Sequence, residues 1–306
     1  MSLPSRQTAV ALGAAVFSLV NPTAGAADVP DAAVLRARAV QVLRHELATT
    51  SGFVRVHAAE ALIEHGQTAE IAALYTADLA TATPPYRIGV WRVLARLAKT
   101  SAERETWIER IRSALRDPTG PDRVHAAETL AKLAGTQPAD RAVIDAWLAT
   151  ADAPTSAYLR WLRVQLAEPA QRATEELALA ELLRSEHPDA RLRSAYALAR
   201  LRPLTPETIR RLHTAALTEP TESKARAYML AAALAHPTSE PTAAIQLATA
   251  LRTYLERGTV GEKFEIAPTL GRHGDSADIP SLLRLIDSAD ADTRIGGASG
   301  LLYLVR

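Results

Sequence analysis

Cysteine is absent from the 306-residue sequence, and aromatic residues make up only 5% of it. The lack of cysteine excludes thiol catalysis, disulfide bridges and metal sites with thiolate ligands. With so few aromatic side chains, alanine and leucine supply much of the apolar fraction, and both are good helix formers. The composition therefore predicts an all-α protein with closely packed helices.

Neither sign of charge is in clear excess. Lys and Arg together number 35, Asp and Glu together number 34, and Arg6 is the only charged residue among the first 26. A protein that neutralises several phosphates needs a concentrated surplus of basic residues. The balance argues against a dedicated binder of nucleic acids or of anionic membranes.

The first 26 residues have the pattern of a secretory signal peptide. Arg6 supplies a basic start, residues 9–20 form a mostly apolar run, and Ala24-Gly25-Ala26 resembles a signal peptidase site. The run is too short to span a membrane, which takes about 20 residues. We expect cleavage after residue 26 and a periplasmic or secreted protein, 27–306, without direct membrane insertion. The alternative is a buried N-terminal helix.

An internal repeat runs along the rest of the chain. The pattern Arg-Val-His-Ala-Ala-Glu at Arg55–Glu60 recurs 68 positions later at Arg123–Glu128. An Arg or Lys followed by Leu seven positions later returns at intervals of 32, 36, 68, 72 and 31 residues, so the unit is about 34 residues long. The two double-length intervals each hold a divergent unit. Because no linker or change in composition interrupts the units, we expect one continuous array over residues 27–306.

Each unit is expected to form two helices. Its apolar residues return with the 3.6-residue period of a helix, and Pro- and Gly-rich breakers separate the segments. The predicted fold class is an all-α solenoid of about eight helical pairs. The first helices are predicted at residues 31–48, 67–81, 101–116, 138–150, 170–185, 206–217, 240–256 and 277–287. The second helices are predicted at residues 53–65, 86–98, 122–134, 155–167, 190–201, 222–235, 261–272 and 292–305.

The segment from Pro268 to Arg294 resembles the junction between two HEAT-like repeats. Gly271 and Gly274 would close one second helix, and Pro280 would lie in the first turn of the next helix, where its missing N–H costs nothing. Most of the chain resembles such an armadillo-like, HEAT-like array. These arrays include binding scaffolds, regulatory subunits and a few enzymes, so the resemblance implies a fold and not a function.

In the arrays that this chain resembles, the Arg that opens each second helix binds an Asp in the preceding turn, and neighbouring repeats stack these pairs into a ladder. The alternative is a functional track in which Arg55, Arg87, Arg123 and Arg191 are exposed and bind an anion. The pairs that the resemblance implies are Arg123 with Asp117, Arg191 with Asp189, and Arg294 with Asp292.

The sequence lacks the common catalytic and cofactor motifs HExxH, the P-loop, GxGxxG and GxSxG. His57 and His125 each precede a Glu by three positions, which places His and Glu on one helical face. Two repeats separate these histidines, so they should not share a metal ion. We predict a protein that is not an enzyme, with no catalytic residue, metal or cofactor.

Aromatic residues of the second helices are the predicted ligand-binding residues. Second helices form the concave face of a HEAT-like solenoid, and aromatic side chains there suit a protein ligand or a sugar ring. The alternative is that they fill gaps between alanine-rich helices. The predicted residues are Trp91, Trp161, Tyr196 and Tyr228.

The last predicted helix ends in a dense apolar run without a polar capping repeat after it, and solenoid ends normally need such a cap. Its three glycines each lower helix stability by roughly 1 kcal/mol relative to Ala, so burial must hold it. We predict an interface there with a partner or, by self-association, with a second copy. The alternative is that the apolar residues turn inward. The predicted interface residues are Leu301, Leu302, Tyr303 and Leu304.

The segments Phe53–Leu62, Pro85–Leu94 and His125–Leu133 are similar to extracytoplasmic HEAT-like proteins that accompany bacterial sodium/solute symporters. That similarity implies a transporter-associated role. We therefore expect a non-catalytic extracytoplasmic scaffold that binds a protein partner, with a membrane transporter as the implied partner. Two alternatives stay open: a HEAT-like enzyme, such as a lyase or metal-dependent hydroxylase, and a glycan-binding accessory module.

Overall fold

The computed structural model of the protein describes residues 31–236 and 241–306. Within these ranges it contains sixteen α-helices and three short 3-10 turns, which follow one another as eight helical pairs. The predicted all-α solenoid of about eight pairs is confirmed. Residues 31–306 form one compact unit, and the predicted signal peptide, residues 1–26, lies outside the described residues. No helix in the described ranges is long and apolar enough to cross a membrane.

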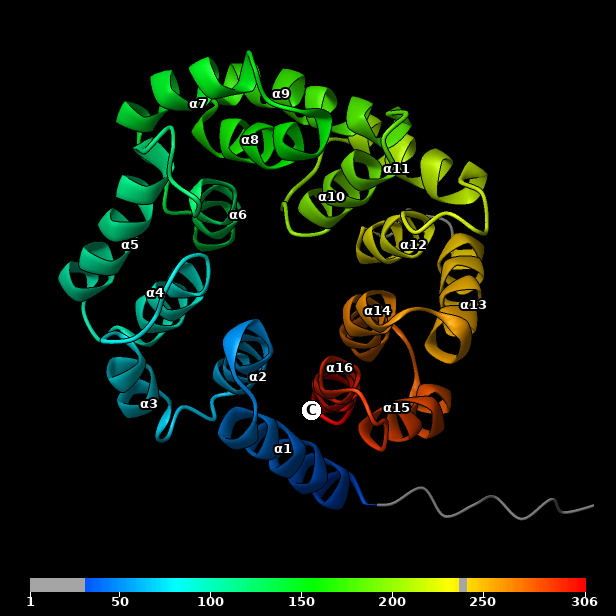
Figure 1. Ribbon diagram of the computed structural model, residues 1–306. Coiled ribbons are helices and arrows are strands. Elements are labelled where there is room, and N and C mark those ends of the chain that lie inside the picture. Colours follow the sequence, from blue (N-terminus) through cyan, green and yellow to red (C-terminus); the bar gives the residue numbers. More distant parts are fainter. Residues whose placement is uncertain (1–30, 237–240) are drawn as a thin grey trace, which may run out of the picture. The chain divides into compact units, whose positions relative to one another are not determined.

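The first helices of the pairs form an outer layer and the second helices an inner layer (Figure 1). Because short connections make each pair an antiparallel hairpin, the inner helices run parallel to one another. The outer helices are α1 (Ala32–Thr49), α3 (Ile71–Asp78), α5 (Ser101–Arg116), α7 (Arg141–Leu148), α9 (Pro169–Glu181), α11 (Pro206–Thr218), α13 (Pro241–Arg257) and α15 (Ile279–Ile286). The inner helices are α2 (Gly52–Glu64), α4 (Tyr86–Leu97), α6 (Arg123–Leu133), α8 (Ala153–Leu166), α10 (Pro188–Leu198), α12 (Arg226–Ala235), α14 (Val260–His273) and α16 (Ala291–Leu304).

Most helices begin and end within a few residues of their predicted bounds, because local signals determine them. Polar side chains cap the first turn of several helices, as Asp152 does for α8 and Thr259 for α14. Helix α3 is predicted from residue 67 but begins at Ile71. Gly66 and Glu70 have φ values of 74° and 69°, which interrupt a right-handed helix between them.

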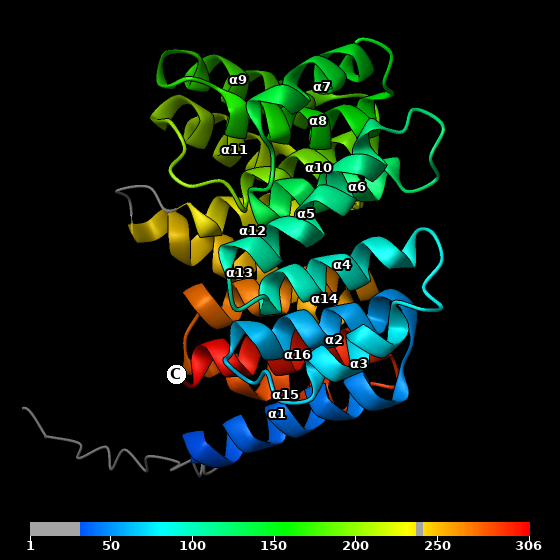
Figure 2. The same ribbon diagram turned by 90° about the vertical axis from the view of Figure 1, so that its left-hand side faces the viewer.

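The array closes into a ring, which is its main departure from an open solenoid with a free last helix. Each inner helix contacts the next, and the last inner helix, α16, contacts the first, α2. Helix α1 packs against both α2 and α16. Figure 1 shows the closed ring, and Figure 2 shows α2, α4 and α6 lying side by side along its wall.

Closure corrects the prediction of a terminal interface for a partner or a second copy. Leu301 and Leu302 are fully buried, Tyr303 is 4% exposed and Leu304 is partly buried. Helix α16 is enclosed by α1, α2, α14 and α15. The first helical pair therefore covers the apolar surface of α16 for which the sequence predicts a partner. The apolar residues at the end of α16 turn inward, as the alternative interpretation holds.

Ion pairs join the first pair, α1 and α2, to the last three helices, α14 to α16; we call this contact the seam. The carboxylate of Glu46 is buried completely and accepts a hydrogen bond of 2.7 Å from Arg294. Removal of Arg294 would leave the buried Glu46 carboxylate without this partner, at a cost in stability, whereas the exposed pairs add little. The other pairs across the seam are Arg38–Asp287 at 2.6 Å, His57–Asp292 at 2.9 Å and Arg272–Glu64 at 2.9 Å.

Several of the arginines that open the inner helices bind acids of the following repeat. Arg55 pairs with Asp78 at 3.2 Å, and Arg191 pairs with Glu219 at 2.9 Å. Each acid lies at the end of the next outer helix, and Glu46 lies near the end of α1 in the same way. The Arg294–Glu46 pair is thus the same ladder contact, made from the last repeat to the first.

The ladder replaces the three ion pairs that the resemblance implies, and those pairs are wrong. Asp117 accepts hydrogen bonds from Thr119, Asp189 pairs with Lys224 and Asp292 pairs with His57. Arg123, which opens α6, donates instead to the Leu115 carbonyl at 2.9 Å. Arg87 pairs with Asp122. Because Arg55, Arg87, Arg123 and Arg191 all contact the protein itself, they are structural residues and do not form an anion-binding track.

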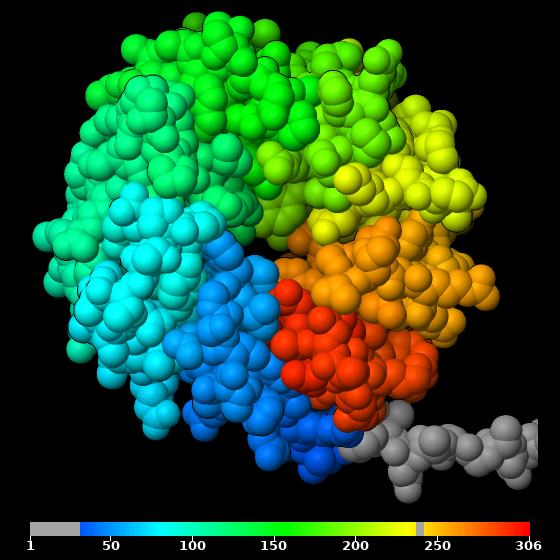
Figure 3. Space-filling model, viewed as in Figure 1, coloured from blue at the N-terminus to red at the C-terminus, as the bar shows by residue number. Residues whose placement is uncertain are grey.

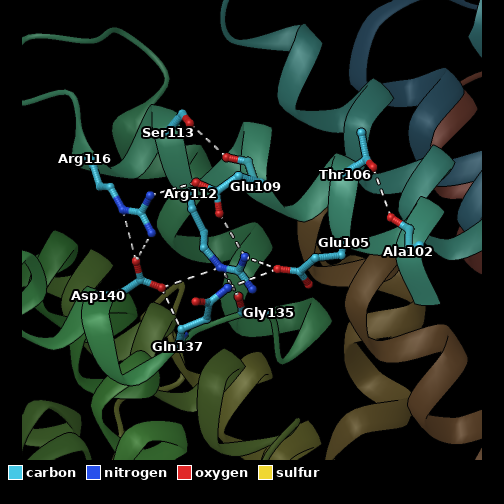
Figure 4. A network of polar contacts seen from close by, with 10 residues as sticks. All are labelled: Ala102, Glu105, Thr106, Glu109, Arg112, Ser113, Arg116, Gly135, Gln137 and Asp140. Atoms are coloured by element: carbon cyan, nitrogen blue, oxygen red, sulfur yellow. Dashed lines mark hydrogen bonds and ion pairs between the residues drawn. The ribbon is translucent and has the colours of Figure 1, made fainter.

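A second set of contacts links consecutive repeats in the outer layer (Figure 4). Asp140, fully buried in the turn before α7, accepts a hydrogen bond of 2.7 Å from Arg116. Arg112 is 3% exposed and donates to the Gly135 carbonyl at 2.8 Å as well as to Glu105 and Glu109. These bonds satisfy the buried Arg112 guanidinium, so the network is structural.

Helices α14 and α16 approach each other so closely that glycine is required between them. A methyl group on Gly271 would overlap the Gly300 carbonyl, and one on Gly300 would lie 2.5 Å from the Ala267 carbonyl oxygen. A methyl group on Gly296 would lie 2.9 Å from the Cα atom of Phe264. The glycines that weaken α16 as an isolated helix therefore allow its tight packing in the ring.

We predict that Gly271→Ala destabilises the protein by about 1–2 kcal/mol, because the backbone overlap outweighs the gain in helix propensity. The measurement is the midpoint of urea unfolding followed by circular dichroism. Gly261→Ala, in the first turn of α14, is the matched control, since a methyl group there meets only the Tyr228 hydroxyl at 3.2 Å. Equal stability of the two variants would contradict a close α14–α16 contact.

Candidate functional site

The inner helices surround a cavity of about 850 Å³, which we call the lumen. Residues from all eight inner helices line it. Figure 3 shows the hollow at the centre of the ring, bordered by blue, green and orange parts of the chain. The lumen takes the place of the open concave face that the sequence predicts.

Three of the four predicted aromatic residues line the lumen, and Trp91 does not. Trp161 is only 1% exposed and packs edge-on against Tyr196 at 6.2 Å. The guanidinium of Arg200 lies 3.5 Å from the centre of the Tyr196 ring. Both rings thus fill space between helices, as the alternative interpretation holds, and neither offers a bare face for stacking.

The tyrosine hydroxyls are more available than the rings. Tyr196, Tyr228 and the unpredicted Tyr158 line the lumen, and their hydroxyls bind no other group among the described residues. Burial raises the pKa of each of these phenols, so all three stay neutral. Each can donate or accept one further hydrogen bond inside the lumen.

A pair of charged side chains bridges α2 and α4 at the wall. Arg92 donates to both oxygens of Glu60, at 2.8 and 2.9 Å, and to the Thr129 hydroxyl at 3.0 Å. Burial acts to raise the pKa of Glu60, but the charges of Arg92, Lys132 and Arg96 outweigh it and lower the pKa to about 2. Glu60 is therefore ionised at neutral pH.

The other acids of the lumen are paired in the same manner. Glu128 accepts from Lys132 at 2.9 Å, and the cations around it overcome its burial and lower its pKa to about 2. Glu265 of α14 accepts hydrogen bonds of 2.8 and 2.9 Å from the two terminal nitrogens of Arg200, which lies just after α10. Glu64 pairs with Arg272 across the seam. Sequence reasoning missed all of these residues except Glu60 and Glu128, which the repeated Arg-Val-His-Ala-Ala-Glu pattern marks.

His57 and His125, which precede Glu60 and Glu128 by three positions, contact other residues. His57 lies 2.9 Å from Asp292 and packs against Phe264, whereas His125 stacks on Phe53 outside the lumen. Among the described residues, no three His, Asp or Glu side chains come together as metal ligands would. The lumen thus combines neutral phenols with paired carboxylates, an arrangement suited to hydrogen bonding rather than to proton donation by Glu60 or Glu128.

His236, at the end of α12, makes the stability of the ring sensitive to acid. It is 5% exposed, and burial lowers its pKa to about 4, although its hydrogen bond to the Leu198 carbonyl acts in the opposite direction. Unfolding restores an ordinary pKa near 6.5. Between these two values the unfolded chain binds a proton that the folded chain does not, so folding stability falls as the pH falls.

We predict that wild-type protein loses roughly 2 kcal/mol more stability than His236→Gln between pH 6.5 and pH 4. The measurement is the free energy of urea unfolding at several pH values. His187→Gln, which changes an exposed histidine at the start of α10, is the control and should follow the wild type. If His236→Gln also follows it, His236 is not the group responsible.

No family model matches this sequence, and no curated protein matches it. One solved structure is similar to it, an engineered protein determined by the Northeast Structural Genomics Consortium. The similarity covers 89% of this chain and 84% of the other, with 17% sequence identity and a TM-score of 0.31. A likeness this distant adds nothing to the helical-pair architecture described above.

Proposed function

We propose that this protein is a non-catalytic binding module and that its ligand site is the lumen. The observation that supports this proposal most directly is the cavity itself. Its volume of about 850 Å³ lies within the range of roughly 300–1,000 Å³ that is typical of small-molecule binding sites. Fixed ion pairs and neutral phenols around it offer hydrogen bonds in a preorganised geometry. The ligand is a small polar molecule that enters the ring.

The lumen changes the expected role of a protein partner. A cavity of this size admits a small molecule or an extended stretch of chain, but not a folded domain. A transporter or another protein partner would therefore contact the outside of the ring. We keep the HEAT-like classification, the transporter association and the periplasmic or secreted location as proposals that rest on the sequence resemblance and on the signal-peptide pattern.

The enzyme alternative has one observation in its favour, the contact of His57 with Asp292 beside the lumen. Such a pair orients an imidazole in many catalytic sites. Here it also bridges α2 and α16 at the seam, so it already has a structural role. The low pKa values of Glu60 and Glu128 favour binding over acid catalysis.

We predict that Ala199→Phe abolishes ligand binding, because Ala199 lines the lumen just after α10 and a phenyl ring there would occupy it. A library of small polar metabolites is screened by thermal shift against wild type and variant. Compounds that stabilise the wild type should not stabilise Ala199→Phe.

Ala146→Phe, which places the same ring on an exposed site of outer helix α7, is the matched control and should bind as the wild type does. A compound that stabilises Ala199→Phe as much as the wild type binds outside the lumen and contradicts the proposal.

A further inference from the structure

Cations outnumber acids among the residues that line the lumen. Six cationic and four acidic side chains line it. Glu60 forms ion pairs with two of the cations, Arg92 and Arg96, and each of the other three acids pairs with one cation. One cation, Arg202, is left without a carboxylate partner in the part of the chain that the structure describes. The six cations are Arg92, Arg96, Lys132, Arg200, Arg202 and Arg272, and the four acids are Glu60, Glu64, Glu128 and Glu265.

Arg202 lies where three neighbouring inner helices, α10, α12 and α14, end. Its Nη1 group donates to the carbonyls of Ala199 and Leu201, at 3.0 and 2.9 Å, and contacts His236. These bonds cap the end of α10, which is a structural role. They use only Nη1, and within the described residues Nε and Nη2 donate to no acceptor.

The surroundings of Arg202 are positive. Arg202 is exposed, and partial desolvation together with the like charges of Arg272 and Arg200 lowers its pKa. Burial and the charges of Arg202 and Arg272 lower the pKa of His273 in the same way. We call Arg202, Arg272 and His273, all lumen-lining residues, the basic end of the lumen. Arg272 and Arg200 have carboxylate partners, so an anion placed there would compensate the charge of Arg202, which pairs with no carboxylate among the described residues.

We propose that the lumen binds a small organic anion whose carboxylate or phosphate group lies at the basic end, against the unused Nε and Nη2 donors of Arg202. A guanidinium presents two parallel N–H groups that match the oxygens of either anion. The polar body of the ligand extends toward the hydroxyls of Tyr196 and Tyr228. This inference rests on the proposed function, because it names the ligand class of the same site.

The test uses the full-length protein at low salt and three probes: citrate, inorganic phosphate and the neutral sugar maltotriose. Titration calorimetry measures their affinities, and added sodium chloride should weaken anion binding. We expect binding by citrate, by phosphate or by both. Stronger citrate binding identifies a carboxylate as the preferred group, and stronger phosphate binding identifies a phosphate.

The decisive variant is Arg202→Gln, for which we expect a loss of affinity for the bound anion of about tenfold or more. Arg202→Lys retains the charge and should retain part of the affinity. Arg210→Gln is the matched control, since the Arg210 side chain is 70% exposed on outer helix α11. It removes the same charge outside the lumen and should leave affinity unchanged. Circular dichroism confirms that each variant is folded.

Three results would overturn the inference. Failure of both anions to bind at millimolar concentration is the first, and equal affinity in folded Arg202→Gln and wild type is the second. The third is equal loss in Arg202→Gln and Arg210→Gln, which would indicate an effect of net charge alone. If maltotriose binds the wild type but not Ala199→Phe while neither anion binds, the lumen is a binding site and only its anionic ligand is excluded.

Discussion

The seam between the first and last helical pairs is the contact on which the other features of this structure depend. Without it the inner helices would form a curved wall open to solvent, and with it they enclose a cavity of about 850 Å³. The seam also covers the two ends that a solenoid otherwise has to cap. Because Arg294 binds Glu46 as Arg191 binds Glu219, the ring closes with the contact that already joins other successive repeats.

Helices and their pairing could be predicted from the sequence because local signals produce them: a 3.6-residue apolar period, capping side chains and breakers. Closure of the ring could not be predicted in this way. It depends on the small rotation between each repeat and the next, summed over the whole array, whereas a sequence period gives only the length of the repeat. Gly271 and Gly300 show the difference. Taken alone, each weakens its helix, whereas in the ring each allows backbone contact between α14 and α16.

The candidate site was predictable only in part, for a similar reason. Second helices and three of the four chosen aromatics do face the lumen, since the repeat register determines which helix lies inside. The partners of charged residues depend on curvature: Arg92 follows Glu60 by 32 positions, and Arg200 precedes Glu265 by 65. No local pattern connects such residues. Tyr196 therefore looked like an exposed binding residue, although Arg200 covers its ring.

Three residues belong to the lumen and to the seam at once, which links occupation of the cavity to closure of the ring. His57, Glu64 and Arg272 line the lumen, and they bridge the seam in the His57–Asp292 and Arg272–Glu64 pairs. A ligand that binds the closed ring more tightly than an opened one must stabilise closure by the same free energy. The basic end of the lumen includes Arg272, so an anion held there would act next to a contact that closes the ring. Binding and closure are in this way parts of one equilibrium.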